Sequence, residues 1–398
     1  MKTVGAPGYA ALGAGLIAIS YGLARYAFGL FVPPIRAELG LSPDIVGTVG
    51  SLAFISFALA SLVASPVADR LGARNAAIVA GAFALAGLTL ISQAHGTAVL
   101  ATGVFACGIS TGLMMPALSA GVQAAVRPGL HGRVNAVMNA GTSLGLVVCL
   151  PAVLLLSDAW RSAYGAFALL AALGMLAAWL LPAASRVDGA RAARPARLSR
   201  GQWQSLTGLS LFCFATGVVA SAYWIFAPDL VVEVGGLSSG TTGSLWLAIG
   251  IAGLAGAWAS DLSDRIGSAA TQALALVATG VALALIAAAP GHPVVALVSA
   301  AVFGWAFMTL SGLYLVSGIR LLPQRPSLGP VMPFLAATVG QAVGAPLAGW
   351  AISRIGYTEA FTSFALLALL IAGCSPLYPG YLYGRWVRVA RAGKVASP

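Results

Sequence analysis

The decapeptide SPVADRLGAR, residues 65–74, has a second copy later in the chain, SDLSDRIGSA at residues 260–269. In both copies an Asp-Arg pair is followed, after one apolar residue, by glycine, and Asp69 and Asp264 are 195 residues apart. Each copy follows a long apolar run. A repeat at about half the length of a 398-residue chain indicates an internal duplication, with the same order of elements in each half.

The composition predicts the fold class. The chain is 59% hydrophobic and 8% charged, and its mean hydropathy is +0.93, values typical of a membrane protein. Apolar runs of about 20 residues are long enough to cross a bilayer as helices, which satisfy their own backbone hydrogen bonds. We therefore predict an all-α integral membrane protein. Its twelve predicted spans are residues 9–33, 45–67, 76–94, 98–125, 134–156, 162–182, 205–228, 241–260, 269–289, 293–316, 329–352 and 360–381.

The basic residues predict the orientation. With both termini cytoplasmic, 17 of the 21 basic residues lie on the cytoplasmic side, and only Arg36, Arg161 and Arg354 lie outside. This asymmetry follows the positive-inside rule and indicates a multi-pass protein with cytoplasmic termini; the resemblance described below implies a bacterial inner (plasma) membrane. The net charge of +11 then reflects loops beside anionic lipid, so we expect membrane lipid and no nucleic acid as a partner.

The longest polar connection divides the chain. Residues 183–203 carry five arginines and one aspartate without apolar periodicity, which predicts a basic cytoplasmic linker. The predicted domains are a six-helix bundle at 1–182, this linker, and a second six-helix bundle at 204–384. A basic cytoplasmic tail follows at 385–398. Duplicated halves of this kind are typical of transporters.

Together with the spans and the linker, the repeated Asp-Arg-x-Gly element resembles the loop motif of the major facilitator superfamily. The stretch GLARYAFGLFVPPIRAELGLS, residues 22–42, further resembles the start of the bacterial YbfB/YjiJ-type group. The motif departs from the family pattern at its first position, where Ser65 and Ser260 replace glycine. The resemblance implies two pseudo-symmetric bundles that rock around a central site, with helices 2, 5, 8 and 11 at their interface.

The resemblance also implies a mechanical role for the repeated loops. In that family the first loop locks the cytoplasmic gate when the protein faces outward, and the second repeats the device more weakly. The gating residues carried over are Asp69, Arg70, Arg74, Asp264 and Arg265.

Arg25 is the one basic residue inside a predicted span. A guanidinium at that depth costs at least about 2.5 kcal/mol unless it faces water or a partner. All ten acidic residues fall in predicted loops or at span ends, so no carboxylate is expected at its depth. Arg25 is either structural, by snorkelling or bonding to carbonyls and hydroxyls, or it grips an anionic substrate. We favour the anionic substrate.

Most other candidate contacts lie on helices 1, 4, 7 and 10, which the resemblance places around the cavity, and Gln341 lies on helix 11 at the interface. Helical spacing puts Tyr21, Arg25, Phe28 and Phe31 or Val32 on one face, although ordinary aromatic packing also explains the rings. Tyr223 or Trp224 covers the ligand from the side of the seventh span, or both belong to the belt of aromatic residues at the membrane–water interface. Gln341 makes an interhelical hydrogen bond, which we favour, or contacts the substrate. The full predicted set is Tyr21, Arg25, Phe28, Ser110, Met114, Tyr223, Trp224, Thr309 and Gln341.

The sequence contains few residues that could couple transport to the movement of protons. The three histidines lie in predicted loops, no acidic residue is expected to be buried, and Leu146 replaces the proline of the antiporter signature. We therefore expect anion exchange, facilitated movement, or a proton carried with the substrate.

The sequence thus predicts a secondary-active or facilitative transporter of a small carboxylate-like organic anion, working by alternating access. The alternative is a proton-driven exporter of drug-like or neutral or cationic molecules, with Arg25 structural; a receptor on the same fold is a further possibility. An enzyme is not expected, because no nucleophile, base and metal ligands converge at one depth. We expect a monomer with no cofactor and no metal site, and we interpret the four cysteines as packing residues.

Overall fold

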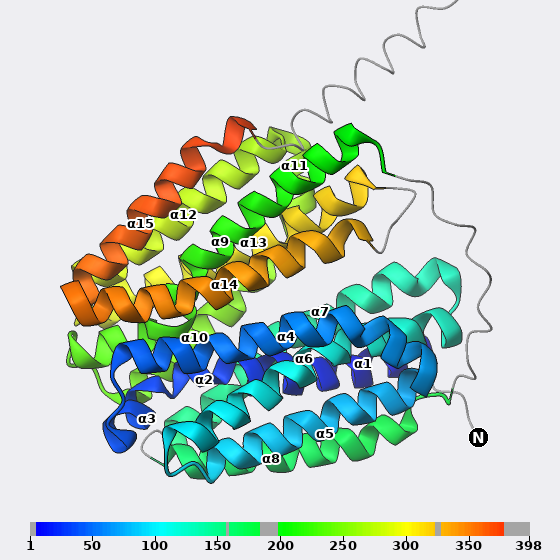
Figure 1. The fold of residues 1–398 in the computed structure, drawn as a ribbon, viewed down its shortest axis with the longest axis horizontal. Helices are drawn as coiled ribbons and strands as arrows, with labels where there is room; N and C mark the ends of the chain where they lie inside the picture. Colours follow the sequence, from blue (N-terminus) through cyan, green and yellow to red (C-terminus); the bar gives the residue numbers. More distant parts are fainter. Residues whose placement is uncertain (1–4, 157–158, 184–197, 323–327, 378–398) are drawn as a thin grey trace, which may run out of the picture.

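The computed structural model describes residues 5–156, 159–183, 198–322 and 328–377, and the regular structure in these residues is helical (Figure 1). In the first half, the helices are α1 (Ala6–Ile17), the π-helix η1 (Ala18–Tyr26), α2 (Ala27–Leu30), α3 (Val32–Leu39), α4 (Pro43–Leu71), α5 (Ala73–Ser92), α6 (Thr97–Ala125), α7 (His131–Leu156) and α8 (Trp160–Ala177). In the second half, they are α9 (Arg200–Glu233), α10 (Ser239–Leu254), α11 (Ala259–Ile266), α12 (Ser268–Ala288), α13 (Pro293–Leu321), α14 (Leu328–Ile355) and α15 (Tyr357–Gly373).

Most helix contacts stay within one half of the chain. In the first half α5 and α6 pack together and α1 packs on α7, and in the second half α9 packs on α14 and α12 on α15. The two halves meet where α4 packs on α14 and α7 packs on α10. These four helices correspond to predicted spans 2, 11, 5 and 8, the interface that the family resemblance implied.

By helix length and composition, the described residues contain fewer candidate membrane spans than the twelve predicted. Within the described residues, nine helices are long and apolar enough to cross a membrane, or ten if the bent pair α10 and α11 forms one span. This pair bends by 55° at a short 3₁₀ segment, Ala255–Trp258. Helices α7 and α15 lie at two further predicted spans but are not among these nine or ten helices. The all-helical membrane fold is therefore observed, and the count of twelve stays a prediction.

The beginning of α9 differs from the sequence prediction. Ser199 caps the helix: its side chain accepts from the Gln202 backbone N–H, and the Gln202 side chain accepts from the Ser199 backbone N–H. The last four residues of the predicted linker, 200–203, are consequently helical. Most of the linker (184–197) and the predicted tail (385–398) lie outside the described residues.

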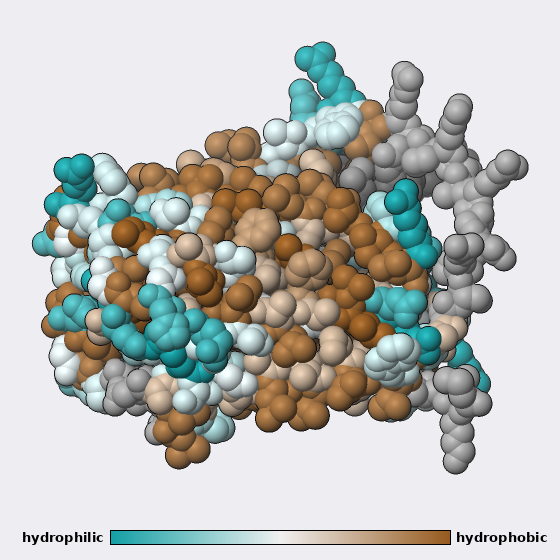
Figure 2. Space-filling view, turned by 60° about the horizontal axis from the view of Figure 1, so that its bottom comes forward, coloured by the Kyte–Doolittle hydropathy of each residue, from teal (hydrophilic) through white to brown (hydrophobic). Residues whose placement is uncertain are grey.

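The surface has the polarity of a membrane protein. Figure 2 shows hydrophobic side chains gathered in a broad band across the middle of one face, with hydrophilic side chains toward both ends. Large apolar side chains stay exposed, for example Leu155, Leu180 and Leu370. In water such a surface would be unfavourable, whereas lipid solvates it.

Glycines allow equivalent helices in the two halves to pack backbone against backbone. A Cβ at Gly141 or Gly145 of α7 would lie 2.2 or 2.4 Å from carbonyl oxygens of the first transmembrane helix. A Cβ at Gly340 or Gly344 of α14 would lie 2.0 or 2.4 Å from carbonyl oxygens of α9. These glycines therefore let α7 and α14 pack closely within their own halves, while Gly349 of α14 lies at the interface between the halves, where a Cβ would be 2.3 Å from the Pro43 carbonyl oxygen.

Candidate substrate site and gate

Arg25 lies on an irregular part of the first transmembrane helix. Residues Ala18–Tyr26 form a π-helix, a conformation that is rare and often found at functional sites. Helix α6 contacts this segment through hydroxyl groups: Ser110 donates to the Ser20 hydroxyl at 3.2 Å, and Thr111 donates to the Ser20 carbonyl at 2.9 Å. Arg25 occupies the last turn of the π-helix and is only 7% exposed.

The guanidinium of Arg25 has partners in the protein. Its Nη2 donates to Oε1 of Gln341 on α14 at 3.0 Å, so the favoured interhelical hydrogen bond of Gln341 is present. Its Cζ lies 5.3, 5.1 and 4.4 Å from the ring centroids of Tyr26, Phe54 and Phe57, within cation–π range. No carboxylate pairs with it among the described residues. The positive charge is therefore contacted by an amide and by rings, and it is not neutralised.

Three buried nitrogen donors in this region lack an acceptor among the described residues: Nε of the Arg25 guanidinium itself, Nε2 of Gln341 and Nε1 of Trp224. Because a guanidinium only donates, Gln341 must turn its oxygen to Arg25, which leaves its NH₂ group free. The ring of Trp224 lies 4.4 Å from that of Tyr26, which itself faces Arg25. We call Arg25, Tyr26, Trp224 and Gln341, with Phe54 and Phe57, the Arg25 cluster. Its unpaired polar atoms are all donors.

Tyr21 and Phe28 of the predicted helical face lie near this cluster, whereas Phe31 has its ring partners elsewhere. Tyr21 packs edge-on against Phe57, with centroids 6.3 Å apart. Phe28 is buried beside α4. Phe31 instead packs on Tyr164 of α8 at 5.5 Å. Phe31 was one of two alternatives for this position of the face, and the other, Val32, is buried.

Four other residues predicted to contact the substrate lie outside the Arg25 cluster and contact other groups in this conformation. Ser110 bonds to Ser20, and Met114 is buried in a separate apolar cluster with Tyr9 and Met138. Tyr223 bonds to the Ser299 hydroxyl at 2.9 Å and stacks on Phe303. Thr309 lines a pocket of about 430 Å³ between α11 and α13, beside Trp258 and Arg265. The structure thus groups Arg25, Gln341 and Trp224, with Tyr21 and Phe28 close by.

The predicted gating residues lie at the end of the molecule near the N-terminus, here called the linker end. Asp69, Arg70 and Arg265 are exposed, and the Arg74 guanidinium lies 5.2 Å from the Trp179 ring in the same half. Asp264 accepts from Arg320 of the same half at 2.9 Å. The ion pair and the ring contact of these side chains thus each lie within one half, as far as the described residues show. Their role as a lock stays a prediction.

The opposite end, where α3 lies in Figure 1, is closed by contacts between the halves; we call it the closed end. A Cβ at Gly29 would lie 1.8 Å from the Trp224 carbonyl oxygen, and one at Gly47 would lie 2.4 Å from that of Ala345. Ser353 donates to Asp44 across the same boundary at 3.3 Å. Backbone contact at glycines thus brings the halves together here.

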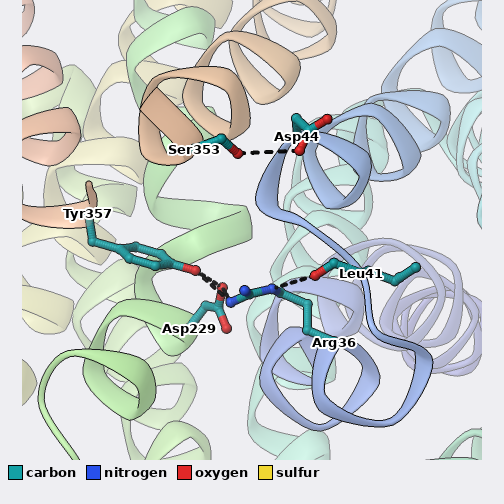
Figure 3. A network of polar contacts seen from close by, with 6 residues as sticks. All are labelled: Arg36, Leu41, Asp44, Asp229, Ser353 and Tyr357. Carbon is teal, nitrogen blue, oxygen red and sulfur yellow. Dashed lines mark hydrogen bonds and ion pairs between the residues drawn. The ribbon is translucent and has the colours of Figure 1, made fainter. Parts of the chain in front are cut away.

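A buried charged group spans this closed end (Figure 3). Arg36 of α3 donates from Nη1 to Oδ2 of Asp229 on α9 at 2.5 Å, and Tyr357 of α15 donates its hydroxyl to the same oxygen. Arg36 also donates to the Tyr357 hydroxyl at 2.6 Å and, through Nε, to the Leu41 carbonyl at 3.1 Å. We call Arg36, Asp229 and Tyr357 the gate triad.

The gate triad corrects a sequence prediction. Asp229 is 0% exposed, whereas no acidic residue was expected to be buried. The predicted seventh span stopped at residue 228, but α9 continues to Glu233 and encloses Asp229 in its last turns. The apolar residues on both sides of Asp229, in IFAPDLVV at 225–232, were the signal that the helix continues.

Two helical halves with a repeated loop motif, which meet where α4 packs on α14 and α7 on α10, are typical of membrane transport proteins. The chain belongs to the Major Facilitator Superfamily, whose family model matches residues 14–327.

Solved structures of transporters share this fold. The nucleoside transporter NupG superposes with a TM-score of 0.76 at 13% identity, over 93% of this chain and 98% of that one. A POT family transporter in complex with 5-aminolevulinic acid gives 0.77 at 14% identity, over 93% and 96%. A bacterial homolog of the human lysosomal transporter Spinster, in an inward-facing and occupied conformation, gives 0.71 at 15% identity, over 97% and 98%. A search of curated proteins by sequence found no match.

Proposed function

We propose that the protein moves a small organic anion with a carboxylate-like group across the membrane by alternating access, and that Arg25 contacts the anionic group. The observation that carries this proposal is the Arg25 cluster: a buried, uncompensated guanidinium and three buried donors without acceptors. Unsatisfied buried donors are costly, and an anion that accepts from them removes the cost.

The competing proposal keeps Arg25 structural and gives the site a neutral or cationic molecule, exported with proton coupling. The hydrogen bond to Gln341 and the three rings favour it, because they are protein partners for the guanidinium. A cation at this site would face the uncompensated charge of Arg25, and a neutral body would leave the donors unpaired unless it carried acceptors. We therefore prefer the anion. The likeness to the solved transporters indicates the fold and not the substrate.

Several features of the proposal come from the sequence. We infer an orientation with both termini cytoplasmic in a bacterial inner membrane, so that the closed end is the outer end. We also propose the domain bounds given above, a monomeric transporter, membership of the YbfB/YjiJ-type group, and a locking role for Asp69, Arg70 and Arg74 when the outer end opens.

A thermal-stability screen of the detergent-purified protein tests the role of Arg25. We expect organic anions to raise the melting temperature of the wild type, and Arg25→Gln to remove this effect. A ligand at about 100 times its dissociation constant stabilises the folded state by about 2.7 kcal/mol, which is readily measured.

Arg320→Gln is the matched control, because it also removes one arginine but from an exposed ion pair at the linker end. It should leave the anion response unchanged. Stabilisation by cations, or equal stabilisation of wild type and Arg25→Gln by anions, would show that Arg25 is structural.

A further inference from the structure

The net charge of the Arg25 cluster indicates a narrower class of ligand than small organic anions in general. We propose that the transporter selects monocarboxylates with an apolar body over dicarboxylates of the same skeleton. This inference rests on the proposed function and adds the charge and the shape of the ligand.

The charged side chains of the Arg25 cluster predict the charge of its ligand. Arg25 is the only cationic side chain in the cluster, whose other polar groups are the Gln341 amide, the Trp224 indole and the Tyr26 hydroxyl, and the cluster contains no carboxylate. The position equivalent to Arg25 in the second half, 195 residues later, is Ala220, which is buried in α9. The cluster therefore carries a charge of +1, which one carboxylate neutralises.

The Arg25 cluster is unfavourable for a ligand with two carboxylates. A second carboxylate on the ligand would enter a buried site without a matching cation, and an unpaired buried charge is strongly unfavourable. Specificity of this kind arises from the penalty against the wrong ligand as much as from contacts with the right one.

The rings around the unpaired donors favour an apolar body for the rest of the ligand. Around the donors stand the rings of Tyr26, Phe54 and Phe57, and the Trp224 indole contacts Phe303 and Phe307 with centroids 5.4 and 5.3 Å away. Aromatic walls with a few directed donors suit an apolar body that carries one polar head.

The test uses matched probes on the full-length detergent-purified protein, with melting temperature as the readout. Hexanoate and adipate differ by one carboxylate, as do benzoate and phthalate, and methyl benzoate removes the charge of benzoate. We expect hexanoate and benzoate to bind at least about tenfold more tightly than their dicarboxylate counterparts, and methyl benzoate to give no shift.

Gln341→Glu makes the test specific to the cluster. This variant keeps the shape of Gln341 and places a carboxylate beside Arg25, so that the cluster charge falls from +1 to zero. We expect benzoate binding to be lost and methyl benzoate to become the better ligand. If the variant does not fold, Trp224→Phe replaces it: the ring stays, one unpaired donor is removed, and benzoate should bind about tenfold more weakly. Trp258→Phe, at an exposed tryptophan, is the control and should bind benzoate like the wild type.

The outcomes separate the inference from the proposed function. If adipate and phthalate bind as tightly as hexanoate and benzoate, the monocarboxylate inference is overturned and the anion transporter stands. If no carboxylate stabilises the protein, or methyl benzoate stabilises the wild type as well as benzoate does, both are overturned. Unchanged benzoate binding in Gln341→Glu or Trp224→Phe would place the carboxylate site outside the Arg25 cluster.

Discussion

Replacement of Gly29 by alanine is expected to hold the closed end open and to stop transport. The added Cβ would lie 1.8 Å from the backbone carbonyl oxygen of Trp224 in the other half, and backbone yields less readily than a side-chain end. Overpacking of tight contacts costs about 1–3 kcal/mol, and we expect the upper end of this range. Since about 1.4 kcal/mol is a factor of ten, the ratio of closed to open molecules should fall about 100-fold.

The measurement is the distance between spin labels at two exposed loop positions of the closed end, His95→Cys in the first half and His292→Cys in the second. The exposed Cys374 is first replaced by serine, while the three other cysteines are buried. Gly29→Ala should lengthen the distance. Gly15→Ala is the control in the same transmembrane helix, because its Cβ meets no atom within 4 Å. An unchanged distance in Gly29→Ala would mean that the halves close without this contact.

Replacement of Arg36 by alanine is expected to open the same end by a different route. It leaves Asp229, which is 0% exposed, with the Tyr357 hydroxyl as its one remaining donor. Removal of one partner of a buried ion pair costs about 3–5 kcal/mol, and we expect the lower end because the Arg36 side chain is 16% exposed. Opening of the halves lets water reach the carboxylate. The longer label distance should therefore become dominant.

A second substitution distinguishes lost charge pairing from lost packing. In Arg36→Ala/Asp229→Ala no buried charge remains, so closure should be largely restored. Ser353→Ala serves as a control, because it removes a neutral hydrogen bond across the same boundary and should have a small effect. If the double variant is as open as Arg36→Ala, the gate triad acts through packing and not through its charges.

Much of the fold follows from local sequence patterns. Apolar runs predicted helices that the structure contains at each predicted position, and the repeated Asp-Arg-x-Gly element predicted the duplicated arrangement. Boundaries were predicted less well, because capping at Ser199 and the continuation of α9 past Asp229 depend on single residues within longer patterns. The 3₁₀ break between α10 and α11 was not predicted either.

The candidate site was predicted in part. Arg25 stood out because a charge in an apolar run is costly, and Gln341 because it is a strongly polar side chain in its span. Their hydrogen bond joins residues 316 positions apart in the chain, a separation that a local pattern does not reveal. The packing of Phe31 on Tyr164 of α8 likewise depends on the tertiary structure.

The sequence by itself therefore determined the helical membrane architecture, the duplication and the presence of an intramembrane cation, because these depend on composition and periodicity along one chain. Tertiary structure alone decided which donors lack acceptors, which end is closed, and that Asp229 is buried beside Arg36 and Tyr357. Each of these depends on the packing of one half against the other, where burial and pairing of polar groups are set by residues far apart in the sequence.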